Sequence, residues 1–286
     1  MQTRKVRKAV IPAAGHGTRF MPITKSVPKE MLVLVDKPAI HYIVEECAES
    51  GIEEVAIIVS RGKEAIERYF TPTLNDTPEL KALLKKIKIT FITQETLNGT
   101  GGAILLTKEF VGDEPFAVLF GDDVVVNDVP CIKQLIDAYD ETGKTVVGVQ
   151  EVENELAVLY GAIEKGEAHG RFTEFKNLIE KPDINNLPSN LVSLGRFVLS
   201  NGIFGALEQT PMRGTELVLP EAVSTIGRRG RLYLRRGALR HRKQVGICYR
   251  RRRLLACAIR RRLQKTHKNY FVVFFVRTVI KTSLLP

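Results

Sequence analysis

The sequence contains no tryptophan, only four cysteines and no long apolar run. The cysteines, Cys47, Cys131, Cys248 and Cys257, are widely separated and form no C-x-x-C pair, which argues against a zinc site or a disulfide framework. No apolar run approaches the ~18 residues that span a bilayer. The charged N-terminus leads into an apolar segment typical of a strand, so no signal peptide is expected. These absences favour a cytoplasmic globular protein without a membrane partner.

Acidic residues are missing from the C-terminal part of the chain. From Arg228 to the end there are 19 Lys and Arg and no Asp or Glu. The preceding part therefore carries 24 of the 43 basic residues and all 32 acidic ones, a net charge of −8, although the whole chain has a net charge of +11. The composition divides the chain into an acidic globular part, residues 1–227, and a basic segment, residues 228–286.

Apolar segments of two kinds alternate over the first 152 residues. Continuous β-branched runs predict buried strands, and apolar residues at helical spacing predict helices between them. The expected strands are residues 5–12, 55–59, 87–93, 116–120 and 145–152, and the expected helices are residues 39–50, 64–70, 79–86 and 132–142. This alternation predicts an α/β fold with a Rossmann-like, doubly wound, mostly parallel sheet.

The remaining globular part, residues 153–227, has a different pattern. Shorter strands with polar turns are expected at residues 160–164, 172–180 and 191–199, and a helix at residues 214–226. We therefore expect a small β-rich subdomain over the open edge of the sheet. In such folds ligands bind beyond the carboxyl ends of the strands.

Residues 10–31 read V-I-P-A-A-G-H-G-T-R-F-M-P-I-T-K-S-V-P-K-E-M. A strand end is followed by a loop of small residues, 13–17, whose N–H groups could hold phosphate oxygens. Three cations follow, Arg19, Lys25 and Lys29. The pattern is neither a Walker loop nor G-x-G-x-x-G. The loop alone also fits an ordinary strand-to-helix turn, but with the cations it favours a triphosphate site.

Two further loops at the expected carboxyl edge carry polar side chains. Gln94 ends a strand and precedes Gly99 and Gly101; its amide could pair with a pyrimidine, or be an ordinary loop residue. Asp122, in F-G-D-D, follows a buried strand directly. A carboxylate there suits Mg²⁺, although a solvated turn residue is the alternative.

The run A-A-G-x-G-T-R-F-x-P-x-T-K-x-x-P-K-E-M resembles the signature of the nucleotidylyltransferases that make sugar nucleotides. Its P-K-E-M ending points to the uridylyl branch, since thymidylyl relatives usually carry a Lys-Gln-Leu-Leu type of sequence. The resemblance covers residues 5–226. It implies transfer of a uridylyl group from UTP to glucose 1-phosphate, with Mg²⁺ as cofactor and a homodimer or homotetramer as the assembly. A nucleic-acid partner is not expected.

The resemblance also assigns roles to residues of this chain. It implies a catalytic role for Arg19, Lys29 and Asp122, with Asp122 also as metal ligand. It implies nucleotide binding by Ala13, Ala14, Gly15, Gly17, Lys25, Gln94 and Gly99, and sugar-phosphate binding by Gly161, Glu180 and Lys181. One departure is Gly101-Gly102-Ala103, where the family commonly has Gly-His-Ala.

Two other functions stay open at this point. The first is a thymidylyltransferase, or an enzyme with another hexose 1-phosphate as acceptor. The second is an inactive nucleotide-sugar-binding protein whose basic segment binds nucleic acid or anionic lipid.

The resemblance stops after Gly227. The family continues with V-Y-x-Y…G-x-R-Y-D-x-G-x-K-x-G-Y, whose aspartate supplies a second metal ligand. Codons for Arg231 onward can be chosen so that reading from the second base gives V-Y-T-Y-E-E-G-R-Y-D-I-G-N-K-L-G-Y-A-I-A-A-V-D. This order of residues is hard to obtain by chance. Our hypothesis is that residues 228–286 are an aberrant, out-of-frame and poorly structured tail, produced either by a real frameshift or by a sequencing error.

Overall fold

The computed structural model describes residues 4–125, 127–169, 172–229, 233–235 and 244–245. Its strands are β1 Lys8–Pro12, β2 Val33–Leu34, β3 Lys37–Pro38, β4 Glu54–Val59, β5 Lys88–Thr93, β6 Phe116–Leu119, β7 Val124–Val125, β8 Val146–Glu151, β9 Gly161–His169, β10 Phe172–Glu180, β11 Leu191–Leu199, β12 Tyr233–Arg235 and β13 Gln244–Val245. Its α-helices are α1 Ala39–Glu49, α2 Glu64–Phe70, α3 Pro78–Lys86, α4 Gly99–Leu105, α5 Lys108–Val111, α6 Cys131–Thr142, α7 Asn154–Ala157, α8 Gly202–Gln209 and α9 Leu219–Arg229. Four short 3₁₀ helices, η1 Thr18–Phe20, η2 Ile23–Lys25, η3 Lys29–Met31 and η4 Ile184–Asn186, complete the described elements.

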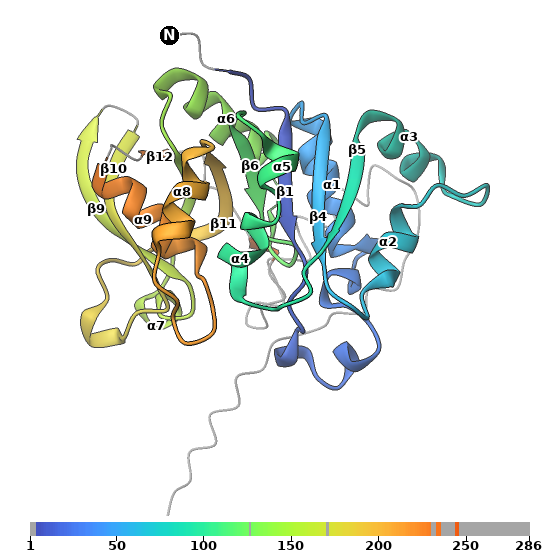
Figure 1. Ribbon diagram of the computed structural model, residues 1–286, viewed down its shortest axis with the longest axis horizontal. Helices are drawn as coiled ribbons and strands as arrows, with labels where there is room; N and C mark the ends of the chain where they lie inside the picture. Colours follow the sequence, from blue (N-terminus) through green and yellow to red (C-terminus); the bar gives the residue numbers. More distant parts are fainter. Residues whose placement is uncertain (1–3, 126, 170–171, 230–232, 236–243, 246–286) are drawn as a thin grey trace, which may run out of the picture.

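The central feature is a nine-stranded sheet with the order β5-β4-β1-β6-β11-β8-β12-β10-β9 (Figure 1). Strands β5, β4, β1 and β6 run parallel to one another. Strand β11 is antiparallel to both β6 and β8, and β12 runs parallel to β8. The loops that follow β1, β5 and β6 therefore lie at the same edge of the sheet, which is where the sequence predicted the ligand site.

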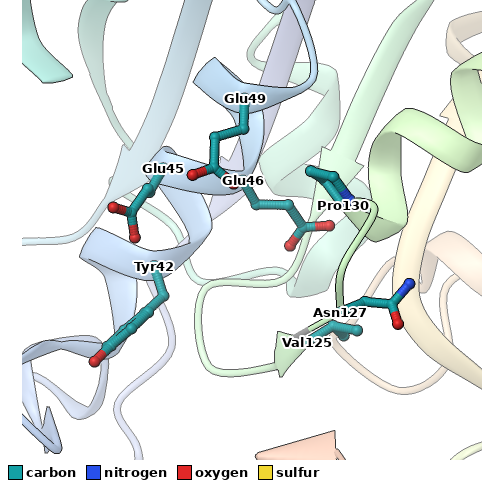
Figure 2. A pocket seen from close by; sticks show the side chains of 7 residues that line it. All are labelled: Tyr42, Glu45, Glu46, Glu49, Val125, Asn127 and Pro130. Carbon is teal, nitrogen blue, oxygen red and sulfur yellow. The ribbon is translucent and has the colours of Figure 1, made fainter. Parts of the chain in front are cut away.

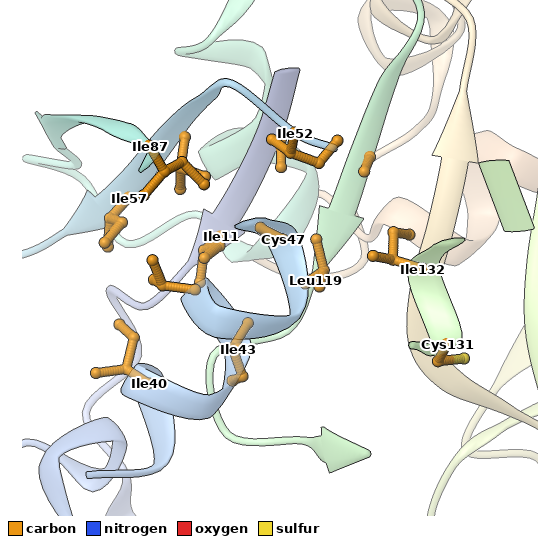
Figure 3. Packing of buried hydrophobic residues seen from close by; sticks show 14 of the residues in the cluster. Ile11, Ile40, Ile43, Cys47, Ile52, Ile57, Ile87, Leu119, Cys131 and Ile132 are labelled. Atoms are coloured by element: carbon orange, nitrogen blue, oxygen red, sulfur yellow. The ribbon is translucent and has the colours of Figure 1, made fainter. Parts of the chain in front are cut away.

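Helices cover both faces of the sheet, so the parallel strands β1, β4 and β6 are buried on both sides, whereas β5 at the edge is only partly buried. Alternate residues of β1 enter two different cores: Ala9 and Ile11 lie in one, and Val10 lies in the other. The first core is formed against α1 and α6; Figure 3 shows Ile43 and Cys47 of α1 beside Ile11. The second core is formed against α4, α8 and α9. This burial explains the continuous β-branched runs of the sequence.

The doubly wound α/β prediction is confirmed, and several element bounds agree closely with the structure. Helix α2 and strands β10 and β11 have the predicted ends. Residues 94–102 were predicted as a loop, but α4 begins at Gly99, and helix α8 was not predicted. The strands predicted for the β-rich part are present, yet they continue the main sheet, and β11 lies inside it.

The two cysteines with described side chains, Cys47 and Cys131, are buried, and neither forms a disulfide within the described residues. Cys248 and Cys257 lie outside the described residues. Within the described ranges, every helix is too short or too polar to cross a membrane. Most of the basic segment, residues 230–232, 236–243 and 246–286, also lies outside the described residues. Its described parts are the end of α9, β12 in the main sheet and β13, so the predicted poorly structured tail applies only to the rest.

Candidate active site

A cavity of about 800 Å³ opens at the carboxyl edge of the parallel strands. This volume lies within the range of small-molecule sites in proteins. Most of the residues predicted from the sequence line it together: Ala14, Gly15, Gly17, Arg19, Lys29, Gln94, Gly99, Asp122, Gly161, Glu180 and Lys181. They come from segments up to 167 positions apart in the chain, so the fold creates this cluster.

The loop after β1 lines the cavity, and two side chains donate hydrogen bonds to its backbone carbonyls. The Ser60 hydroxyl donates a hydrogen bond to the Ala14 carbonyl at 2.7 Å, and the Lys63 ammonium donates to the Ala13 carbonyl. Gly17 has φ +67, a left-handed conformation that favours glycine. Because the carbonyls of Ala13 and Ala14 are bonded on the protein side, the loop has a fixed shape before any ligand arrives.

Lys63 also binds a buried carboxylate next to the cavity. Its ammonium lies 2.8 Å from the Glu30 carboxylate, which is fully buried. Burial raises the pKa of Glu30 and lowers that of Lys63, and in each case the charge of the partner opposes the shift. The pair is therefore maintained by mutual attraction against a cost of desolvation.

Lys29 and Asp122 form an ion pair at the centre of the cavity, with Nζ and Oδ2 2.9 Å apart. Burial opposes both charges, but mutual attraction and the hydrogen bond between them outweigh it. The pKa of Lys29 therefore lies above its ordinary value, aided by Glu30, and that of Asp122 lies below its ordinary value. Both groups are charged at neutral pH. A cation and a carboxylate thus meet where the β1 and β6 loops converge.

A buried Arg–Glu pair supports the loop that carries Asp122. Arg196 of β11 is fully buried and donates through Nη2 to the Glu46 carboxylate at 2.9 Å and to the Asp123 carbonyl at 2.5 Å. Glu46 of α1 also accepts from the Ile132 backbone N–H at the start of α6. Figure 2 shows the Glu46 side chain extending from its helix toward Pro130, beside a small pocket of about 40 Å³. The Arg196–Glu46 pair therefore connects β11, α1, the loop after β6 and the start of α6.

Gln94 also lines the cavity and is almost completely buried. Its backbone N–H donates to the Val59 carbonyl at 2.7 Å, which extends the pairing of β5 with β4 by one residue. Its amide nitrogen donates to Asn98 Oδ1 at 2.9 Å and to the Gly99 carbonyl at 3.3 Å. These hydrogen bonds fix the Gln94 side chain at the start of the loop that follows β5.

The residues predicted to hold a sugar phosphate lie on β9, β10 and the turn after β10. Gly161 of β9 is paired with Glu180 of β10. A Cβ at Gly161 would approach Leu178 Cδ1 to 2.9 Å, so glycine leaves room for that packing. Lys181 has φ +47, an uncommon conformation for a residue with a side chain, and its backbone N–H donates to the Tyr160 carbonyl.

Two of the predicted site residues do not line the cavity. Ala13 is buried, with its carbonyl bonded to Lys63, and Lys25 is exposed in η2. Conversely, Arg213 and Glu216 line the cavity without having been predicted. Arg213 donates to the Glu180 carbonyl at 3.1 Å. The charged residues beside Gly214 were the only signal in the sequence that could have indicated them.

Together, the fold and the cavity define an α/β nucleotide-binding enzyme, because a small-residue loop, cations and one carboxylate meet at the carboxyl edge of parallel strands. The comparisons with known proteins identify the family. The family model described as Nucleotidyl transferase matches residues 8–236. The chain belongs to the nucleotidyl transferase family.

Individual relatives agree with this assignment. The chain is 45% identical over 247 residues to UTP–glucose-1-phosphate uridylyltransferase 2 of Staphylococcus saprophyticus, covering 80% of this chain and 84% of that protein. It is 44% identical over 243 residues to UTP–glucose-1-phosphate uridylyltransferase of Bacillus subtilis, covering 80% and 83%. A solved structure of UDP-glucose pyrophosphorylase complexed with UDP-glucose matches with a TM-score of 0.78 and 36% identity, over 84% of this chain and 92% of that one.

Proposed function

We propose that the chain transfers a uridylyl group from UTP to glucose 1-phosphate, giving UDP-glucose and pyrophosphate. The observation that carries the proposal is the single cavity that contains Arg19, Lys29, Asp122, Glu180 and Lys181. The sequence relatives named above supply the identity of the two substrates. The four cations that line the cavity, Arg19, Lys29, Lys181 and Arg213, suit a reaction between two phosphate esters.

In the proposed reaction a phosphate oxygen of glucose 1-phosphate attacks the α-phosphorus of UTP. The bond from that phosphorus to the oxygen bridging to the β-phosphate breaks, and pyrophosphate leaves with the bonding electrons. No covalent enzyme intermediate is required. The protein positions the two reactants in line and neutralises the charge that develops on the departing group.

The β1 loop and its cations are proposed to bind the triphosphate. The N–H groups of residues 14–17, which line the cavity, face phosphate oxygens, and Arg19 and Lys29 balance their charge. Gln94 and Gly99 contact the base, and Glu180 accepts hydrogen bonds from sugar hydroxyls. Lys181 neutralises the phosphate of the sugar phosphate.

Asp122 fits a magnesium ion, because its carboxylate is ionised and lines the cavity. Mg²⁺ needs only one or two protein carboxylates and takes its other ligands from phosphates and water. A dedicated cluster is therefore not required, and the described residues contain no group of three or more metal-ligating side chains. When bound, Mg²⁺ would neutralise charge at the α-phosphate.

Pyrophosphate release tests the proposed function. We expect release that requires UTP, glucose 1-phosphate and Mg²⁺ together, and that falls to background with excess chelator. Replacing UTP by dTTP distinguishes the uridylyl from the thymidylyl reaction, and galactose 1-phosphate or mannose 1-phosphate tests the acceptor. Binding of UDP-glucose without any pyrophosphate release would instead indicate an inactive binding protein.

We also propose that the coding frame is shifted from about Arg228 onward. Resequencing the DNA across codons 224–232 is expected to show an inserted or deleted base. The chain with the restored frame should have higher turnover and should elute as a homodimer or homotetramer on size-exclusion chromatography. An intact frame with unrelated codons would contradict this. Salt-dependent DNA binding that is lost on truncation after Gly227 would support a functional basic tail instead.

A further inference from the structure

The amide nitrogen of Gln94 is already engaged within the protein. It donates to Asn98 Oδ1 at 2.9 Å and to the Gly99 carbonyl at 3.3 Å. An amide offers two donors on nitrogen and an acceptor on oxygen. Gln94 lines the cavity, and the amide atom that neither Asn98 nor Gly99 engages is its oxygen. The side chain can therefore meet a base only as a hydrogen-bond acceptor.

The position of Asn98 is itself fixed by its backbone. The Leu217 N–H donates to the Asn98 carbonyl at 2.7 Å, and the Gly101 N–H donates to the Leu217 carbonyl at 2.8 Å. The β5 loop is thus attached to the segment before α9 on both sides of Asn98. A change at Asn98 that keeps the backbone would leave this attachment in place.

Gly102 provides the space for the Asn98 side chain. A Cβ at Gly102 would lie 1.8 Å from Oδ1 and 2.3 Å from Cγ of Asn98, far inside any permitted contact. Only glycine at position 102 is compatible with the observed Asn98 conformation. Asn98 and Gly102 therefore act as a pair.

We propose that Asn98, accommodated by Gly102, is a positioning residue that fixes the Gln94 amide with its oxygen toward N3 of the base and thereby selects uracil over cytosine. The inference rests on the proposed function. Uracil has an N–H donor at N3, whereas N3 of cytosine is an acceptor that would face another acceptor. Rotating the Gln94 amide would present its nitrogen to N3 of cytosine, but the rotation would break the hydrogen bonds to Asn98 and Gly99. Bound cytosine therefore leaves hydrogen-bonding groups unsatisfied in either orientation of the amide.

The test compares UTP and CTP in Asn98→Ala, Asn98→Asp and Gly102→Ala. We expect Asn98→Ala and Gly102→Ala to lower kcat/KM for UTP about tenfold, mainly through KM, and to reduce the preference for UTP over CTP by a similar factor. Asn98→Asp keeps the acceptor and should keep the preference. Asn75→Ala, in the exposed loop between α2 and α3, is the matched control and should match the parent protein.

Calorimetric binding of UTP and CTP separates this inference from the proposed function. If the parent protein binds UTP more tightly than CTP but releases no pyrophosphate, the proposed function fails and the role of Asn98 is still measured by the binding ratio. Thermal melting identifies the variants that fold, and Asn98→Ser replaces Asn98→Ala if the latter does not. An unchanged UTP to CTP ratio in the folded variants that remove or displace the Asn98 acceptor would overturn the inference.

Discussion

Replacing Lys29 by alanine is expected to lower kcat by about 10²–10³-fold, the usual cost of removing one preorganised charge-stabilising group. Lys29 Nζ lies 2.9 Å from Asp122 Oδ2, and a Cβ at Gly15 would come within 3.9 Å of it. The ammonium is therefore between the proposed metal ligand and the phosphate loop. Because its pKa is raised, it stays charged throughout the neutral range. Steady-state pyrophosphate release measures the effect.

The fold should survive this substitution. Glu30, the buried carboxylate beside Lys29, keeps its ion pair with Lys63, and the Asp122 side chain is 39% exposed. Lys29→Arg keeps the charge and should retain more activity than Lys29→Ala. Lys86→Ala, an exposed lysine at the end of α3, is the matched control. Full turnover in a folded Lys29→Ala variant would rule out the proposed role.

Arg196→Met is expected to lower the free energy of unfolding by about 3–5 kcal/mol, the cost of leaving a buried charge without its partner. The variant would leave Glu46 almost completely buried and unpaired. It would also remove the donor to the Asp123 carbonyl, next to Asp122. Denaturant unfolding followed by circular dichroism measures the loss, and turnover should fall with it because the Asp122 loop loses its support.

A double variant tests the cause of this destabilisation. Replacing Arg196 by methionine and Glu46 by leucine removes both charges and keeps apolar volume, so most of the lost stability should return. If the double variant were as unstable as Arg196→Met, unpaired charge would not be the reason. Arg68→Met on α2, an arginine with no contact to the pair, controls for the change of residue type.

Patterns with a local cause could be predicted from the sequence. Strand β4 is buried on both of its faces, which explains its continuous β-branched run. Helix α1 packs one apolar face against the sheet, which explains the helical spacing of its apolar residues. Both patterns can be recognised in the sequence. Helix α4 was missed because three glycines between 99 and 102 argue against a helix. Its start is set by tertiary contacts instead: Gly99 has φ +90, and its backbone lies against Leu217.

The candidate site likewise contains some residues that could be predicted from the sequence and others that could not. Arg19 and Asp122 follow β1 and β6 at short distances, so their meeting at one edge could be expected from a parallel sheet, whereas Lys29, 17 residues after β1, was assigned through the family resemblance. Arg196 could not be assigned, since nothing in a sequence distinguishes a fully buried arginine from an exposed one. Its partner, Glu46, is 150 positions away and lies on a helix that reads as amphipathic.

The continuous sheet also limits how the enzyme can respond to its substrates. The cations near β1 and the residues on β9 and β10 belong to one hydrogen-bonded layer, in which β11 pairs with β6 through Arg196–Leu199 and touches β9 at Val192. A hinge rotation of the β9–β10 part relative to the β1 part would break the hydrogen bonds between neighbouring strands of the sheet. The cations beside β1 and the proposed sugar-phosphate residues on β9 and β10 are therefore carried by one continuous platform.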